Sequence, residues 1–418
     1  MTRFSTKLIA GLLVGGIAAV AVPAVAKDKK VEAAVPAGGP DQKKITKPVR
    51  AALLEINGLV AAGDNAGVVA RTKALQATPL NPDEAFYVAA SQLTASQAIK
   101  DDVTTEAAIK TMVDSPFLSA ADRPRYINNL AILAQKRRDY VAVVKYREQL
   151  IAMNPGDADG ILNLALVYRE LKQTPQAIAT LGKAIDAKKA AGGKPDESWY
   201  QTRLQMAYDA KTAEIQPASI ALVSDYPTAT NWSNVLNIYR DSVNADDQLN
   251  LDTFRLMRAA GALGGERIWQ EYASTALEKG LPGEAKKVLD EGVAAKKLTG
   301  TKPIEKEIST VAAPKLKADL ASLPGLEREA AKAATGKTAL GTGDAYYGYG
   351  NYAKAAEMYR LAATKSSGAD AATANLRLGA ALAMAGDKAG ATTAFNTVSG
   401  SPRAQLGKYW LVYLSQKA

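Results

Sequence analysis

Two short stretches of the chain carry residue types that could hold a phosphate group or a metal ion. Residues 331–338 read AKAATGKT, a form of the phosphate-binding loop in which Lys337 and Thr338 would contact a nucleotide and its Mg²⁺. Such a loop follows a buried strand, but a polar run at residues 327–329 precedes this one, and Ala331 replaces the first glycine. We therefore interpret residues 335–336 as the end of one helix before the start of the next.

The second stretch, residues 154–160, places Asp157 and Asp159 at the spacing of two calcium ligands. The other ligands of a calcium loop and its terminal Glu are missing, and Asn-Pro-Gly is typical of a turn between helices. We expect a turn at this position. We expect no metal site and no cofactor in the chain.

The chain contains no Cys and no His. This composition excludes disulfides, Cys/His zinc sites, iron–sulfur clusters and every Ser-His-Asp or Cys-His mechanism. We expect a protein that is not an enzyme. One enzymatic alternative stays open, a carbohydrate-active enzyme on a helical scaffold, because the fold and not the sequence spacing brings the two carboxylates of a glycosidase together.

The first 26 residues have the pattern of a secretory signal. Two basic residues precede an uncharged apolar run at residues 8–22, and residues 24–26 form an Ala-x-Ala cleavage pattern. A run of 15 residues is short for a membrane span, which needs about 20. We expect cleavage after Ala26 and a periplasmic or secreted bacterial protein with no later membrane span. An uncleaved anchor stays open, because lysines follow within residues 27–30.

The net charge of the mature chain is mild. The full chain carries +10, and removing the two basic residues of the signal leaves 10 − 2 = +8. The basic residues form short scattered runs, which are typical of solvated helix faces. We expect no nucleic-acid partner, and the charge supports at most a weak attraction to an anionic envelope surface.

Helical periodicity dominates the rest of the chain. Residues 27–46 carry Pro and Gly without apolar periodicity and are predicted to form a flexible linker. From residue 47 onward, apolar residues recur three and four positions apart, and the chain contains 81 alanines, which favour helices. The chain is predicted to be all-α.

The helices repeat with a fixed period. Several apolar and small residues of one segment recur 34 residues later in the next: Leu130, Ala131, Ala134, Val143, Arg147 and Leu150 correspond to Leu164, Ala165, Tyr168, Ala177, Leu181 and Ala184. A second pair of such units lies near the C-terminus, with turns at residues 350–352 and 386–387. Each unit has the pattern of two helices that approach closely at a small residue.

This pattern resembles that of the tetratricopeptide repeat family. The resemblance implies a right-handed α-solenoid of helix-turn-helix repeats that acts as a binding scaffold. It divides the chain into a repeat array at 47–298, an irregular Pro-broken helical segment at 299–336, C-terminal repeats at 337–403 and a capping helix at 404–418. The clearest repeats lie at 124–190, and residues 191–298 are less regular.

The resemblance also implies a concave groove lined by the first helix of each repeat, which binds an extended peptide or a partner helix. The groove positions carried over to this chain are Arg125, Asn128, Asn129, Gln135, Asp159, Asn163, Arg169, Tyr347, Thr373 and Arg377. Asn amides can bind a peptide backbone, and Arg can pair with a carboxylate. We expect a non-enzymatic scaffold that binds a protein or peptide partner. The alternative is a structural subunit of an envelope export or polysaccharide-secretion assembly.

Overall fold

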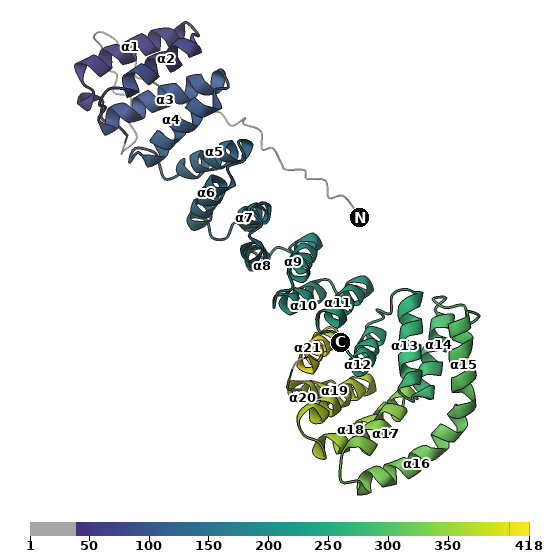
Figure 1. Cartoon of the computed structure of the whole chain (residues 1–418). Coiled ribbons are helices and arrows are strands. Elements are labelled where there is room, and N and C mark those ends of the chain that lie inside the picture. Colours follow the sequence, from purple (N-terminus) through teal and green to yellow (C-terminus); the bar gives the residue numbers. More distant parts are fainter. Residues whose placement is uncertain (1–38, 401, 418) are drawn as a thin grey trace. The chain divides into compact units, whose positions relative to one another are not determined.

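The structure, a computed structural model, describes residues 39–400 and 402–417. Within these residues it contains only helices, turns and loops (Figure 1). The chain divides into two compact units with the boundary between Gly192 and Gly193, which we call unit 1 and unit 2. Within each unit, most successive helices pack on one another, so the predicted all-α solenoid of helical hairpins is confirmed. The predicted signal peptide and its cleavage site after Ala26 lie outside the described residues.

Unit 1 is a stack of helical hairpins. Each helix contacts its neighbours in the sequence. The helices are α1 (Lys47–Ala61), α2 (Asn65–Gln76), α3 (Pro82–Ala98), α4 (Asp102–Asp114), α5 (Arg123–Lys136), α6 (Tyr140–Met153), α7 (Ala158–Glu170) and α8 (Thr174–Ala190).

Aspartates fix where several of these helices begin. The side chains of Asp64, Asp101, Asp139 and Asp157 each accept a hydrogen bond from the backbone N–H three residues later. Such caps satisfy N–H groups that have no partner inside the helix. Asp157 is the N-cap of α7, and its carboxylate accepts from the Gly160 N–H at 2.9 Å. The predicted turn at residues 154–160 is therefore confirmed, and the Asp157 side chain caps a helix.

The 34-residue register places equivalent residues in the core. Val143 and Ala177 occupy the same position on α6 and α8, and both are fully buried. The first helices show the same equivalence, since Leu130 of α5 and Leu164 of α7 are also buried. A small residue at position 177 lets α7 and α8 pack closely together.

We expect Ala177→Leu to lower the free energy of unfolding of the chain by about 1–3 kcal/mol, because three extra carbons have no space at this contact. Ala179 lies on the same helix but is exposed, so Ala179→Leu is the matched control. Thermal unfolding followed by circular dichroism measures both variants. Equal melting temperatures for the two variants would contradict the assigned register.

The end of the predicted flexible linker is in fact anchored to α3. The backbone N–H of Asp41 donates to Asp83 at 2.6 Å, and that of Thr46 donates to Glu84 at 2.8 Å. Ile45 is buried. The prediction of a linker up to residue 46 is wrong for residues 41–46, because buried acceptors on α3 bind this segment, whereas residues 27–38 lie outside the described part.

Unit 2 begins with further hairpins and ends with the C-terminal helices. Its helices are α9 (Glu197–Asp209), α10 (Ile215–Asp225), α11 (Ala229–Ser242), α12 (Asp247–Ala259), α13 (Glu266–Glu278), α14 (Pro282–Ala294), α15 (Pro303–Ala312), α16 (Leu316–Lys332), α17 (Lys337–Gly348), α18 (Tyr352–Thr364), α19 (Gly368–Ala385), α20 (Lys388–Asn396) and α21 (Arg403–Ser415).

The segment 299–336, predicted to be an irregular Pro-broken helical segment, lies in the middle of unit 2. It consists of α15, a short 3₁₀ turn at Ala313–Lys315, and α16. Pro303 occupies the first position of α15, where a missing N–H is tolerated, and Pro324 lies inside α16. Two helices therefore connect the hairpins to the C-terminal repeats.

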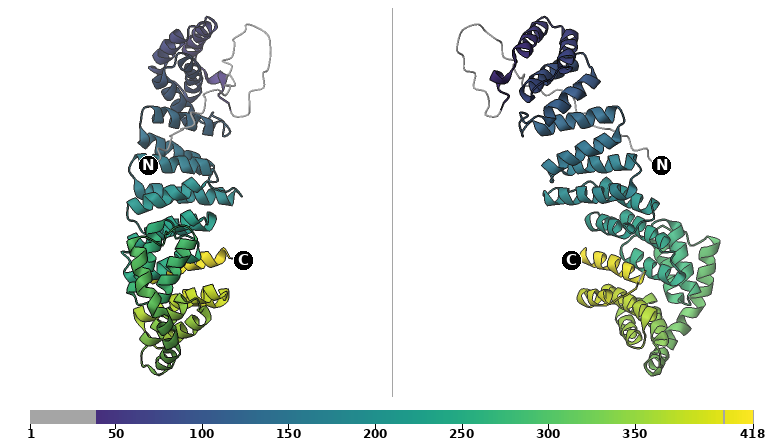
Figure 2. Two further views of the ribbon diagram at one scale, coloured as in Figure 1. Left: turned by 90° about the vertical axis from the view of Figure 1, so that its right-hand side faces the viewer. Right: turned by 60° about the vertical axis from the view of Figure 1, so that its left-hand side comes forward.

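The C-terminal helices of unit 2 return to the hairpins that precede them. Helix α14 packs against α17, α12 against α19, and α10 and α12 against α21, as Figures 1 and 2 show. The approach at Gly348 of α17 is so close that a Cβ there would lie 3.0 Å from the backbone nitrogen of Glu284. The C-terminal helices of unit 2 therefore pack back on its earlier helices, an arrangement that we call the closure of unit 2.

Helix α21 covers the last repeat, as the predicted capping helix would. The residues at its two ends also form hydrogen bonds to α10 and α11. The Gln416 side chain donates to the Val223 carbonyl at 2.7 Å and accepts from the Trp232 indole N–H at 3.2 Å. The Tyr239 hydroxyl donates to the Pro402 carbonyl at 3.0 Å. These bonds join residues more than 160 positions apart in the sequence.

Candidate functional site

Three of the predicted groove residues lie in the interior of unit 2. Tyr347, Thr373 and Arg377 are 2%, 5% and 3% exposed. The Thr373 hydroxyl donates to the Ala369 carbonyl of its own helix at 2.9 Å. The prediction that these three residues line an open groove is wrong. The reason is the closure of unit 2, because α12 and α14 of the same chain cover α17 and α19.

A network of buried charges lies where these helices meet. The Arg377 guanidinium of α19 donates to Asp252 of α12 at 2.7 Å and to Asp344 of α17 at 2.6 Å. The Arg255 guanidinium of α12 donates to both oxygens of Glu284 on α14, at 2.9 and 2.6 Å, and to Asp344 at 3.1 Å. These five residues form the ionic core of unit 2.

Two tyrosines complete the ionic core. The Tyr272 hydroxyl donates to Glu284 at 2.6 Å, and the Tyr359 hydroxyl donates to Asp344 at 2.7 Å. Burial raises the pKa of both hydroxyls well above the usual value, and the adjacent carboxylates raise it further, so both remain donors.

Arg377, one of the two arginines of the network, remains charged. Burial alone would lower the pKa of Arg377, but the carboxylates of Asp252 and Asp344 outweigh burial and hold the pKa above its usual value. Because its charges are paired and hydrogen-bonded, the ionic core joins helices and leaves no open site for a partner.

The other predicted groove residues lie on α5 and α7 of unit 1. Three pairs occupy equivalent positions one repeat apart: Arg125 and Asp159, Asn129 and Asn163, and Gln135 and Arg169. Their side chains are exposed or half-buried. We call this set the α5/α7 face. It carries donors, acceptors and both signs of charge, so it can bind peptide groups and acidic or basic side chains.

The charged side chains of the α5/α7 face form only exposed ion pairs within the chain. Arg125 pairs with Asp122 at 3.2 Å, Arg169 with Glu170 at 3.8 Å, and Asp159 with Lys188 at 3.7 Å. Exposed pairs of this kind contribute little to stability and exchange easily for other partners.

Asn128 differs from its predicted neighbours on the α5/α7 face. It is half-buried, and its carbonyl oxygen accepts from the Arg147 guanidinium of α6 at 2.9 Å. Burial lowers the pKa of Arg147 below its usual value. Asn128 therefore supports the packing of α5 on α6.

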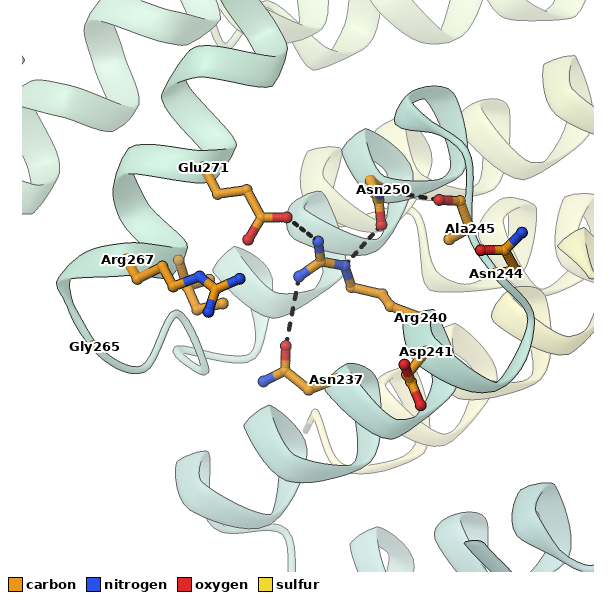
Figure 3. Close-up of a pocket in the computed structure, with 10 residues that line it drawn as sticks. Asn237, Arg240, Asp241, Asn244, Ala245, Asn250, Gly265, Arg267 and Glu271 are labelled. Carbon is orange, nitrogen blue, oxygen red and sulfur yellow. Dashed lines mark hydrogen bonds and ion pairs between the residues drawn. The ribbon is translucent and has the colours of Figure 1, made fainter. Parts of the chain in front are cut away.

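A polar pocket in unit 2 was not predicted from the sequence. It has a volume of about 590 Å³ and lies among α11, α12 and α13 (Figure 3). We call it the α11–α13 pocket. The polar side chains that line it are Asn237, Arg240, Asp241, Asn244, Asn250, Arg267 and Glu271. No local motif marks these residues, since they come from three helices and the loops between them.

Residues 39–400 and 402–417 contain no cluster of acidic side chains suited to a metal ion. In the same residues, no helix combines the length and the apolar character that a membrane crossing requires.

Among the comparisons with known proteins, matches come from solved structures alone. No protein-family model matches the chain, and no curated protein matches it. A tetratricopeptide repeat protein from Parabacteroides merdae, known from a crystal structure, is similar to 80% of this chain over 100% of its own length, with 12% sequence identity and a TM-score of 0.26. The description of the chain as a tetratricopeptide-like solenoid depends on its own hairpins and their 34-residue register.

Proposed function

We propose that the protein is a non-enzymatic interaction scaffold of the bacterial periplasm that binds a protein or peptide partner on the α5/α7 face. Solenoids of helical hairpins present the same helix face in each repeat, and such faces are typical binding surfaces. One observation carries the proposal: equivalent polar residues on successive first helices are exposed or half-buried in unit 1, whereas the chain's own helices cover the corresponding residues in the C-terminal repeats.

The chemistry of the α5/α7 face suits an extended peptide or a partner helix. The Asn129 and Asn163 amides, one repeat apart, can each donate to and accept from a peptide group. Arg125 and Arg169 can pair with carboxylates of the partner, since their own pairs are exposed and weak. The residue types favour binding over catalysis, because the chain has neither His nor Cys.

Removal of three side chains of the α5/α7 face is expected to weaken capture of the partner strongly. The test variant combines Arg125→Ala, Asn163→Ala and Arg169→Ala, all of which are exposed, so the fold is retained. The measurement is affinity capture from a native envelope extract with residues 27–418 as bait, followed by quantitative mass spectrometry. We expect the amount of captured partner to fall by about tenfold or more, because several charge-assisted hydrogen bonds are lost.

The matched control combines Lys145→Ala, Gln149→Ala and Lys183→Ala. These exposed residues lie on the second helices α6 and α8, and the control removes the same charge as the test variant, two cations and one amide. A partner retained equally by both variants would move the binding surface away from the α5/α7 face and favour a structural subunit of an envelope assembly. A partner lost only with the test variant supports the proposal.

A further inference from the structure

The α11–α13 pocket has features of a ligand site that the proposed function does not use. It lies within unit 2, whereas the α5/α7 face belongs to unit 1. Its volume of about 590 Å³ is within the ~300–1,000 Å³ that small-ligand sites usually enclose. The two sites can therefore be tested separately.

Arg240 is held rigidly in this pocket (Figure 3). Its Nε–H donates to the Asn250 Oδ1 atom at 2.7 Å, a second N–H donates to Glu271, and a third lies 3.5 Å from the Asn237 Oδ1 atom. The guanidinium also lies 4.2 Å above the Phe254 ring. A guanidinium has five N–H groups, so these contacts leave two for a ligand.

The two amides beside Arg240 are oriented as well. The Asn237 amide nitrogen donates to the Ser233 carbonyl at 2.8 Å, and that of Asn250 donates to the Ala245 carbonyl at 3.1 Å. Both side-chain oxygens therefore face the guanidinium. Because these side chains are already held in place, they lose little conformational entropy when a ligand binds.

Arg267 brings a second guanidinium to the same pocket. It lies in the first turn of α13, is exposed, and forms no ion pair with any other residue in the described part of the chain. The lining as a whole is neutral, because Asp241 and Glu271 balance Arg240 and Arg267. Arg240 pairs with Glu271 and Asp241 accepts from the Tyr208 hydroxyl, so Arg267 is the lining cation that offers one positive charge to a ligand. A single carboxylate matches that charge better than a phosphate dianion, which the Glu271 carboxylate would repel.

The other residues of the lining indicate which class of ligand bears this carboxylate. Asp241, Asn244 and Glu271 supply acceptors beside the donors of the arginines, and Ile268 is the one large apolar side chain of the lining. Hydroxyl groups both donate and accept, so a polyhydroxylated ligand can satisfy such a lining. A peptide would instead need apolar subsites for its side chains.

We propose that the α11–α13 pocket binds an acidic saccharide of the uronic-acid type. The sugar carboxylate lies between Arg240 and Arg267, and the sugar hydroxyls bond to the Asn237, Asn244 and Glu271 side chains. Recognition of the carboxylate depends on Arg267, because this arginine has no ion-pair partner of its own in the described residues.

Calorimetric titration of residues 27–418 tests the proposal with three probes. The first is trigalacturonate, the second is its trimethyl ester, which keeps the rings and removes the charge, and the third is an acetylated Gly-Asp-Gly amide, which carries the carboxylate on a peptide. We expect trigalacturonate to bind about tenfold or more tightly than either control probe, since charge-assisted bonds to arginine are among the strong ones.

Two variants locate the binding. Arg267→Gln is expected to weaken trigalacturonate binding by about tenfold or more, because the carboxylate loses a charged donor. Arg328→Gln removes an equally exposed arginine on α16 of the same unit and is expected to leave binding unchanged. The proposal is overturned if trigalacturonate does not bind at millimolar concentration, if the ester binds equally well, if the peptide binds more tightly, or if Arg267→Gln binds like the parent chain.

Discussion

Arg377→Ala is expected to lower the free energy of unfolding of unit 2 by about 3–5 kcal/mol. Arg377 is the link between Asp252 on α12 and Asp344 on α17, and its side chain is 3% exposed. Removing the guanidinium leaves two buried carboxylates with fewer partners in a site that water does not reach. An unpaired buried charge is far more costly than a lost exposed one.

Tryptophan fluorescence measures this effect in the full chain. The four tryptophans of the sequence are Trp199, Trp232, Trp269 and Trp410, and all belong to unit 2. Urea unfolding followed at these residues therefore reports on unit 2. Arg360→Ala, which removes an exposed arginine of α18, is the control and should change the stability by less than about 0.5 kcal/mol. Equal midpoints for the two variants would contradict the ionic core.

The second large effect is expected at the C-terminal helix. Trp410→Ala should lower the free energy of unfolding of unit 2 by about 3–5 kcal/mol, because a large buried ring is replaced by a cavity. Trp410 is 1% exposed and stacks on Phe395 with the ring centroids 5.6 Å apart. Its loss weakens the contact of α21 with α20 and, through α21, the closure of unit 2.

Amide hydrogen exchange separates this prediction from general destabilisation. If α21 closes unit 2, Trp410→Ala should speed exchange most in α10 and α12, which α21 covers. Tyr413→Ala, on the same helix but only partly buried, should have a smaller effect. Faster exchange confined to α19 and α20 would show that α21 is only a cap of the last repeat.

The helices and their turns could be predicted because their signals are local. Gly350-Asn351 and Gly386-Asp387 were expected to be turns. In the structure both glycines have positive φ, of 82° and 87°, and the following Asn and Asp side chains cap α18 and α20. The 34-residue register is also local, since each unit repeats the same spacing of small and apolar residues. These features follow from helix geometry alone.

The closure of unit 2 could not be predicted in the same way. It depends on the summed rotations of many hairpins and on the path of α15 and α16, which no spacing in the sequence encodes. One signal was present in residues 251–257, LDTFRLM, in which Asp252 and Arg255 are the charged residues, Thr253 is polar and the other four are apolar. A helix of this kind is buried, so its two charges require buried partners. The partners, 29, 89 and 125 residues away, could not be identified from the sequence.

The residues of the candidate sites also differ in whether a local pattern in the sequence could predict them. Arg125, Asn163 and Arg169 were predicted from the repeat register and are exposed on α5 and α7. Tyr347 and Arg377 were predicted by the same rule and are buried, because a rule for one repeat does not account for another part of the chain that covers it. The α11–α13 pocket has no local pattern, since residues from separate helices form it.

The central claim, that the partner binds the α5/α7 face, is tested most directly by hydrogen exchange of the full chain with and without the captured partner. The account predicts protection in α5 and α7, with the amides of α17 and α19 unchanged because the chain's own helices already cover them. Protection confined to α17–α21, with α5 and α7 unchanged, would contradict it.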